Sequence, residues 1–216
     1  CAFTAQGQCV PSRAVIQTGR YAHECGVMVN YGFFNHQNRI TPRYRTMGNV
    51  FRDAGYHTVY FGKSHIGTPL TELGYDQAVV REKDRIDDDE ARARGIAHVP
   101  LVLRRDYVAA DDAVDWLRGY EPTDRPLFFT FSTNLPHPPF FVEPKYADHF
   151  DAASLELPAS FHEETFAGKP PYQKAHHDDG RHGIDDPVAV REMIRKYLTM
   201  IAMTDEMNSA GQWAFR

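Results

Sequence analysis

Residues 9–20 of the chain, CVPSRAVIQTGR, decide how the other segments are interpreted. Pro11 suits the first turn of a helix, where its missing N–H costs nothing, and Gly19 is a natural residue to end that helix. The stretch therefore predicts a short helix with Cys9 at or next to its N-cap. Free backbone N–H groups and the positive end of the helix dipole favour an anion there. Arg13 lies one turn along, where its planar guanidinium is able to help hold that anion.

Composition places the chain among globular proteins and argues against two classes of partner. Its 216 residues are 42% hydrophobic and 25% charged, which argues against disorder. A net charge of −5 gives no general basic field for nucleic acid, so an anionic substrate requires a local cluster of cations. No run is long or apolar enough to cross a bilayer. The three cysteines, Cys1, Cys9 and Cys25, lack the spacing of a zinc or disulfide framework.

Two apolar runs predict strands, and both are followed by chemically rich loops. Residues 58–61 form a β-branched and aromatic run that leads into Lys63 and His65. Residues 127–131 are almost continuously apolar, which suits a strand covered on both faces, as in a parallel sheet. The proline-rich turn that follows, residues 134–140, contains His137 and fits neither helix nor ladder.

Helices are predicted before, between and after these strands. One starts at Thr41-Pro42 and ends at Gly55, with apolar residues at helical spacing. A second begins near Asp106, with a stripe formed by Tyr107, Ala110, Val114 and Leu117. The last starts at Asp186-Pro187 and runs to about Asn208, with a stripe formed by Val190, Met193, Ile194, Tyr197 and Ile201.

The remaining segments are predicted to be loops. Residues 21–39 have no steady period and are placed to border a site, and residues 141–186 contain scattered prolines. The charged run at 81–95 and the cluster at 176–179 (His-His-Asp-Asp) are interpreted as solvated, because neither has regular metal-ligand spacing.

This order of helices and strands predicts an α/β fold, a mostly parallel sheet with helices on both faces. Sites in such sheets form outside the carboxyl ends of the strands. The start of the Cys9 helix, the Lys63/His65 loop and the His137 loop are therefore expected to share one rim. Together they supply a nucleophile candidate, cations for an oxyanion, and a proton source for a leaving oxygen.

The same residues resemble the sulfatase family in three blocks. Cys9-x-Pro11-Ser12-Arg13 followed by residues 18–20 (Thr-Gly-Arg) is similar to the family signature. Gln17 is a departure, since the family usually has Leu or Met there, and it is expected to pack the helix rather than do chemistry. Residues 55–67 resemble the second block, with Ser64 where Trp is common, and residues 136–139 resemble the third. Tyr197, Ile201 and Asp205 match a later pattern, for which only a structural role is expected.

The resemblance implies a mechanism and a set of roles. Cys9 is oxidised to formylglycine, whose hydrate is the nucleophile and also a ligand of a divalent cation, with Ca²⁺ favoured over Mg²⁺. Arg13 holds that hydrate, and Lys63 and His137 bind the sulfate oxygens. His65 assists the breakdown of the sulfated hemiacetal. The remaining acidic metal ligands are expected outside the chain, and Asp87-Asp88 is a poor substitute for them.

The resemblance also implies an organisation and a setting. Residues 1–216 are expected to be part of an alkaline-phosphatase-like catalytic domain that lacks the first strand and the C-terminal part. The chain by itself is then expected to be inactive. The implied partners are a sulfated small molecule or carbohydrate and a formylglycine-generating enzyme. A periplasmic, secreted or lysosomal location is implied as well.

Two alternatives remain open at this stage. A phosphonate or phosphate ester hydrolase of the same superfamily would use the same Cys9 and Lys63/His65 groups. A non-catalytic homologue that binds sulfated glycans would retain Cys9 as a thiol. A cysteine-thiolate phosphatase is less favoured, because its loop places the Arg further from the Cys than Arg13 is from Cys9.

Overall fold

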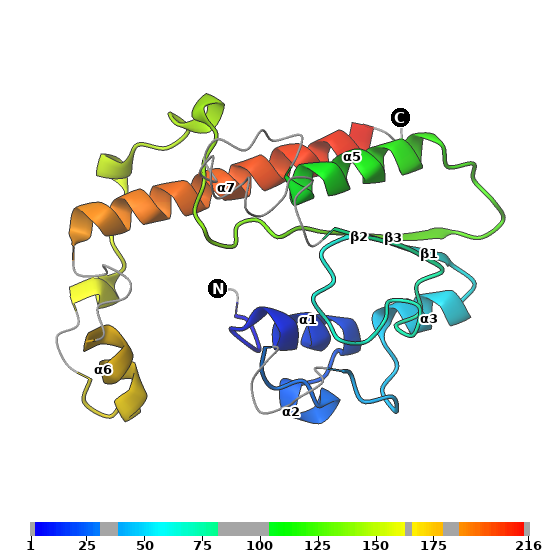
Figure 1. The fold of residues 1–216 in the computed structure, drawn as a ribbon, viewed down its shortest axis with the longest axis horizontal. Helices are drawn as coiled ribbons and strands as arrows, with labels where there is room; N and C mark the ends of the chain where they lie inside the picture. The colour runs from blue at the N-terminus through cyan, green and yellow to red at the C-terminus, as the bar shows by residue number, and fades with distance from the viewer. Residues whose placement is uncertain (1–2, 31–38, 82–103, 163–165, 179–185, 214–216) are drawn as a thin grey trace, which may run out of the picture. The chain divides into compact units, whose positions relative to one another are not determined.

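The computed structural model describes residues 3–30, 39–81, 104–162, 166–178 and 186–213 (Figure 1). The chain divides into two compact units, one formed by residues 1–134 with 207–216, the other by residues 135–206. The predicted charged run at 81–95 falls almost entirely outside the described residues, as do Cys1, Asp87-Asp88 and Asp179.

A parallel sheet of three strands organises the first unit. β1 (His57–Gly62) is central, between β2 (Gln77–Val80) and β3 (Leu127–Ser132), so the order is β2-β1-β3. Tyr60 of β1 is paired with Ala78 of β2 and with Thr130 of β3. The predicted parallel α/β sheet is confirmed, but β2 was not predicted. It has four residues with mostly exposed side chains, and its apolar stretch, residues 78–80, is shorter than the runs at 58–61 and 127–131 that identified the other two strands.

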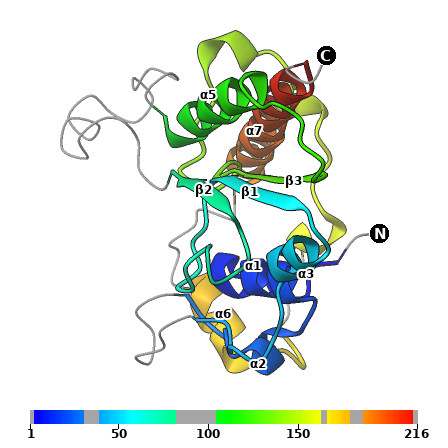
Figure 2. The ribbon, with the colours of Figure 1, turned by 90° about the vertical axis from the view of Figure 1, so that its right-hand side faces the viewer.

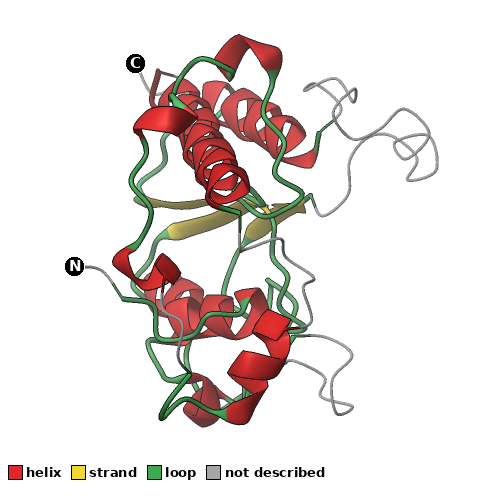
Figure 3. Ribbon diagram, turned by 90° about the vertical axis from the view of Figure 1, so that its left-hand side faces the viewer, coloured by secondary structure: helices red, strands yellow, loops and turns green. Residues whose placement is uncertain are grey.

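The two faces of the sheet bury alternate residues of the same strands. On one face Val59, Phe61 and Phe129 pack with Ala113 of α5 (Arg105–Arg118). On the other face Tyr60 packs with residues of α1 (Cys9–Thr18) and of the loops near it. Figures 2 and 3 show α5 on one side of the strands and α1 with α3 (Met47–Asp53) on the other. Because both faces are covered, consecutive residues such as 59–61 of β1 and 127–129 of β3 are apolar.

Several predicted helix boundaries need correction. α3 begins after Thr46, not at Thr41-Pro42, because the Thr46 hydroxyl accepts the N–H of Asn49 while the Asn49 side chain accepts the N–H of Thr46. The predicted loop at 21–39 contains a one-turn helix, α2 (Ala22–Cys25). α5 buries Asp106, Val108, Ala109, Ala110, Ala113 and Leu117, so the predicted stripe is only partly right, since Tyr107 and Val114 are half-buried.

The second unit, residues 135–206, contains more helix than the predicted loop at 141–186 allows. It includes three short 3₁₀ helices, η3 (Pro144–Tyr146), η4 (Ala152–Ser154) and η5 (Ala159–His162), and the helix α6 (Pro171–Asp178). α6 includes positions 176–178 of the predicted His/Asp loop, so that prediction is wrong there.

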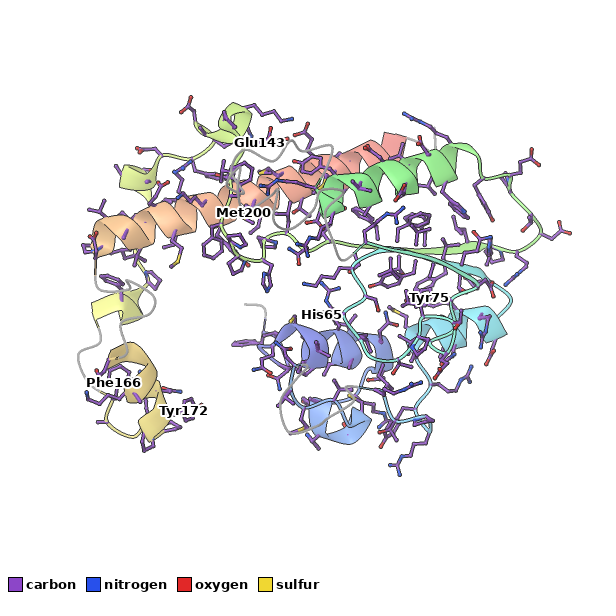
Figure 4. All side chains as sticks on the ribbon, in the orientation of Figure 1. His65, Tyr75, Glu143, Phe166, Tyr172 and Met200 are labelled. Carbon is purple, nitrogen blue, oxygen red and sulfur yellow. The ribbon has the colours of Figure 1, made fainter. Side chains whose placement is uncertain are left out.

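The long helix α7 (Pro187–Trp213) supports this unit and continues beyond it (Figure 4, Met200 labelled). Asp186 caps it as predicted, accepting the N–H of Val188. The helix extends past the predicted end at Asn208. Its predicted stripe is wrong at Met193, Tyr197 and Ile201, which are exposed, whereas Val190, Met200, Met203 and Met207 are buried. The helix has apolar residues on two faces, so periodicity alone selected the wrong one.

Side chains of α7 form hydrogen bonds with residues 146–155, which precede α6 in the sequence. Arg195 donates to the carbonyl of Ala147 at 2.7 Å, and Arg191 donates to that of Leu155 at 3.0 Å. Glu206 accepts from the Tyr146 hydroxyl. Within the described residues, no helix is long and apolar enough to cross a membrane.

The buried face of α1 contains a polar pair at Gln17, the position that departs from the family. Gln17 is 6% exposed, and its Nε2 donates to the hydroxyl of Tyr75 at 3.1 Å. Tyr75 lies on the α1 side of the sheet (Figure 4), and its hydroxyl is also 3.3 Å from Thr130 Oγ1. Burial raises the pKa of Tyr75, so it stays a neutral donor. Gln17 thus packs the helix as predicted, with a buried partner that satisfies its amide.

A double-mutant cycle tests this pair. Tyr75→Phe should cost about 1–3 kcal/mol of unfolding free energy, because it leaves the Gln17 amide buried without its hydrogen bond. Gln17→Leu should cost less, since Tyr75 keeps Thr130. The double variant should recover most of the Tyr75→Phe loss in denaturant unfolding. Strictly additive effects would show that the two side chains are not coupled.

Candidate functional site

Cys9 is the first residue of α1, directly after the N-cap Gln8, as predicted. Its Sγ lies 3.4 Å from Oδ1 of Asn30, and the same oxygen accepts the backbone N–H of Val10 at 3.1 Å. Gln8 itself makes no side-chain capping bond, so Asn30 supplies the acceptor that the helix start needs. A reactive-residue candidate and an amide oxygen therefore meet at the positive end of the α1 dipole, where Asn30 already accepts the N–H of Val10. Gly19 ends α1 in the left-handed conformation (φ 63°), also as predicted.

Arg13 ties α1 to the carboxyl ends of two strands. Its Nη1 donates to the carbonyl of Lys63 at 3.0 Å and to Ser132 Oγ at 2.6 Å, and its Nη2 donates to the carbonyl of Thr133 at 3.0 Å. Lys63 directly follows β1, and Ser132 ends β3. This places the start of the Cys9 helix at the carboxyl edge of the sheet, where the element order predicted it. Three hydrogen bonds also fix the guanidinium, so its charge is preorganised.

Lys63 is a buried cation at the same edge. Lys63 is only 7% exposed, and its Nζ donates to Oδ1 of Asn134 at 2.6 Å. Its carbonyl accepts from Arg13 and from the Tyr60 hydroxyl at 2.6 Å, which fixes the backbone at this turn. A buried ammonium is costly unless it is paired or has a function, since charges are rarely left in low dielectric.

The electrostatics of Lys63 show which groups surround it. Burial lowers the pKa of Lys63, and the positive charge of Arg13 lowers it further, with Arg105 acting in the same direction. Cys9 and Asp106 act the other way and raise it. Cys9, Arg13 and Lys63 are therefore close enough to interact, as the sequence predicted. A site that depresses the pKa of a lysine in this way gains by accepting an anion, because the anion relieves the repulsion between the cations.

His65 lies in the same turn, two residues beyond Lys63. Its φ of 53° is a left-handed conformation that non-glycine residues rarely adopt. The next residue, Ile66, is buried in the cluster that contains Val10 and Ala14 of α1, so this turn packs on the Cys9 helix (Figure 4). Backbone held in such a conformation by its surroundings is often found where a side chain must be aimed.

His137 lies in the second unit. It is exposed, and its Nδ1 lies 2.6 Å from the carbonyl of Pro138. As predicted, this proline-rich turn is neither helix nor strand. A position for His137 beside Cys9 stays a prediction.

The described residues around Cys9 do not form a divalent-cation site. Within them, no three His, Cys, Asp or Glu side chains are grouped to hold a metal ion. Asn30 supplies a neutral oxygen, but the charged side chains that influence Lys63 include two arginines, which repel a cation. A cavity of about 530 Å³ lies elsewhere in the first unit, lined by Arg39, Tyr44 and Glu72 among others, with none of the predicted site residues.

Three further residues at this edge were not predicted. Asn30 contacts Cys9, Asn134 contacts Lys63, and Asp106 accepts the backbone N–H of Asn134 at 2.6 Å. The residues in these three contacts are 21, 71 and 28 positions apart in the sequence, respectively. Short-range sequence patterns do not predict pairs that are so far apart. The order of the elements was the one available indication, because it brings the ends of β1 and β3 together.

Comparison with known proteins gives a family. The family model described as Sulfatase matches residues 2–208. The uncharacterized sulfatase YidJ of Escherichia coli (strain K12) is 26% identical over 198 residues, which cover 80% of this chain and 37% of that protein. Human N-sulphoglucosamine sulphohydrolase is 28% identical over 145 residues, which cover 67% of this chain and 26% of that protein. The chain thus spans well under half the length of these relatives.

Solved structures agree on the fold. The phosphonate monoester hydrolase of Agrobacterium radiobacter matches with a TM-score of 0.68 and 17% identity, over 98% of this chain and 50% of that chain. BT4656, solved in complex with its substrate D-glucosamine-2-N,6-O-disulfate, matches with a TM-score of 0.57 and 17% identity, over 94% of this chain and 51% of that chain. These likenesses show an alkaline-phosphatase-like α/β fold. With a family model that spans almost its whole length, the chain belongs to the sulfatase family.

Proposed function

We propose that the full-length protein hydrolyses a sulfate monoester to an alcohol and sulfate, with a formylglycine derived from Cys9 as its nucleophile. The observation that carries the proposal is the meeting of Cys9, Arg13 and Lys63 at the carboxyl edge of the sheet. Cys9 is the first residue of α1, at the positive end of the helix dipole, which favours an anion. Two fixed cations beside it match the charge that a sulfuryl group carries.

In this proposal each residue has one task. One hydroxyl of the hydrated aldehyde at position 9, oriented by Arg13, attacks sulfur and releases its proton to solvent as the new S–O bond forms. Lys63 neutralises charge on the sulfate oxygens. The S–O bond to the substrate alkoxide breaks, and His137 or Lys63 beside it gives the proton with which it leaves as ROH. The remaining hydroxyl then loses its proton, with His65 as the proposed base. The carbon–oxygen bond to sulfate breaks, sulfate leaves, and the aldehyde re-forms for hydration by water. An ordinary serine offers no such exit.

The maturation enzyme and the metal are parts of the same proposal. Formation of formylglycine requires a separate oxidising enzyme that acts on the Cys9 segment. A divalent cation, Ca²⁺ or Mg²⁺, would need acidic ligands beyond the described residues, because those near Cys9 do not fit it. No step above is assigned to the metal.

The substrate class follows from the relatives by analogy. Human N-sulphoglucosamine sulphohydrolase and BT4656, with its disulfated glucosamine substrate, carry names that concern sulfated sugars. We propose a sulfated carbohydrate or a similar small sulfate ester for this protein.

A paired assay tests sulfate against phosphonate. The full-length protein, produced together with a formylglycine-generating enzyme, is given an aryl sulfate and the matching aryl phosphonate monoester. The proposal expects the larger kcat/KM on the sulfate. A larger kcat/KM on the phosphonate would favour the phosphonate hydrolase alternative, which the fold of the Agrobacterium radiobacter enzyme keeps open.

A further inference from the structure

The segment that leaves β3, residues 132–134, holds both cations of the site. Ser132 and Thr133 accept from Arg13, and Asn134 accepts from Lys63 Nζ. Whatever fixes the backbone of this segment therefore fixes the distance between the two positive charges.

Asp106 is the group that fixes it from α5. It is the second residue of the helix and only 6% exposed. Its Oδ1 accepts the backbone N–H of Asn134 at 2.6 Å, a short charge-assisted hydrogen bond. An acid in the first turn also stabilises a helix through its dipole. That purpose alone is served equally well by an exposed carboxylate, without the cost of burial.

We propose that Asp106 and Asn134 are positioning residues for Lys63. Asp106 holds the Asn134 backbone, and the Asn134 side chain holds the ammonium of Lys63 where a sulfate oxygen is expected to bind. The proposal rests on the proposed function for its catalytic consequence, whereas the geometry of the three residues stands independently of it. A long, flexible lysine side chain gains most from such support, because it otherwise samples many rotamers.

Charge supports the same arrangement. In the described part of the chain, the charged groups that act most on Lys63 are Arg13 and Cys9 from α1, with Arg105 and Asp106 from α5. Asp106 raises the pKa of Lys63 against the opposing effects of burial and of the two arginines. It therefore helps to keep the ammonium protonated as well as placed.

Variants of the full-length enzyme separate positioning from simple structural support. Asn134→Ala removes the acceptor of Lys63 and should lower kcat/KM for an aryl sulfate by about 10- to 100-fold. The alkaline limb of the pH profile should move to lower pH, because the charged form of Lys63 loses its hydrogen bond. Asp106→Asn keeps an oxygen for the Asn134 N–H, removes the negative charge and replaces the second carboxylate oxygen by an NH₂ group. It should move the alkaline limb in the same direction with a smaller loss of kcat. Asp111→Asn, an exposed change on the same helix, is the matched control and should alter neither.

Direct titration of Lys63 makes the test independent of activity. In full-length protein labelled at lysine, the Lys63 NMR signal is assigned by its loss in Lys63→Met. The pKa should fall in Asn134→Ala and in Asp106→Asn, but not in Asp111→Asn. If both variants lower only the melting temperature and leave that pKa unchanged, the positioning proposal is wrong. If the wild-type protein hydrolyses no sulfate ester, the proposed function fails, while the titration still decides between positioning and structural support.

Discussion

Replacing Cys9 by alanine in the full-length protein is expected to lower kcat for a sulfate ester by roughly 10⁴-fold or more, as removal of a covalent nucleophile does in other hydrolases. Alanine keeps the helix start, because the Asn30 bond to the Val10 N–H does not involve the thiol. Binding of the substrate anion by Arg13 and Lys63 should survive, so the loss should fall on kcat more than on KM. Steady-state kinetics on an aryl sulfate measures both.

Cys25→Ala is the matched control for this prediction. Cys25 is a fully buried thiol whose Sγ contacts the carbonyl of Ala22, in the same core cluster as Val10. Its removal should cost stability and leave kcat within a few-fold. Activity retained in Cys9→Ala above about a tenth of wild type would place the nucleophile elsewhere.

The second large effect concerns Lys63. Lys63→Met should lower kcat/KM by roughly 10²- to 10³-fold, the scale of losing one group that stabilises the transition-state charge. At neutral pH the variant should nevertheless unfold at the same or a higher temperature than wild type. The pKa of Lys63 is lowered by burial and by Arg13, so the folded state pays for this ammonium, and methionine of similar length avoids that cost.

The pH dependence of that stability difference has a definite sign. Because the folded pKa of Lys63 lies below its unfolded value, the unfolded chain binds more protons between the two values. Wild-type stability attributable to Lys63 therefore rises with pH through this window, and the advantage of Lys63→Met should shrink there. Lys174→Met, at an exposed lysine paired with Asp178, is the control and should change neither activity nor this slope. A Lys63→Met variant that unfolds more easily at neutral pH yet keeps its activity would make Lys63 a structural residue.

The parts of the fold that the sequence predicts are those with strong local patterns. β1 and β3 contain consecutive apolar residues, at 59–61 and 127–129, because both faces of the sheet are covered, and α1 has a proline near its start and a glycine at its end. β2 is only four residues long, and its apolar residues 78–80 are mostly exposed. The start of α3 was misplaced because Thr41-Pro42 has the composition of a helix start, while the side chain that makes the capping bond is Thr46. Local composition does not show which of these two threonines is the N-cap of the helix.

The difference between local patterns and long-range contacts also explains which residues of the site were predicted. Cys9 and Arg13 are one helical turn apart, and Lys63 directly follows a recognisable strand, so motif and element order together place them. Asn30 and Asp106 hold these groups through contacts with residues distant in the sequence, and only the fold brings them there. Polar residues of this kind are common in loops and first helical turns, so their type alone gives no reason to select them.

Mass spectrometry of the peptide that contains Cys9 shows whether this thiol is converted to formylglycine. The full-length protein is produced with and without a formylglycine-generating enzyme and digested, and the Cys9 and Cys25 peptides are compared. With the enzyme present, we expect the Cys9 side chain to lose sulfur and two hydrogens and to gain one oxygen, while Cys25 stays a thiol. A Cys9 peptide that keeps its thiol under those conditions, in protein that is folded, would rule out the formylglycine nucleophile and favour a homologue that binds sulfated glycans without cleaving them.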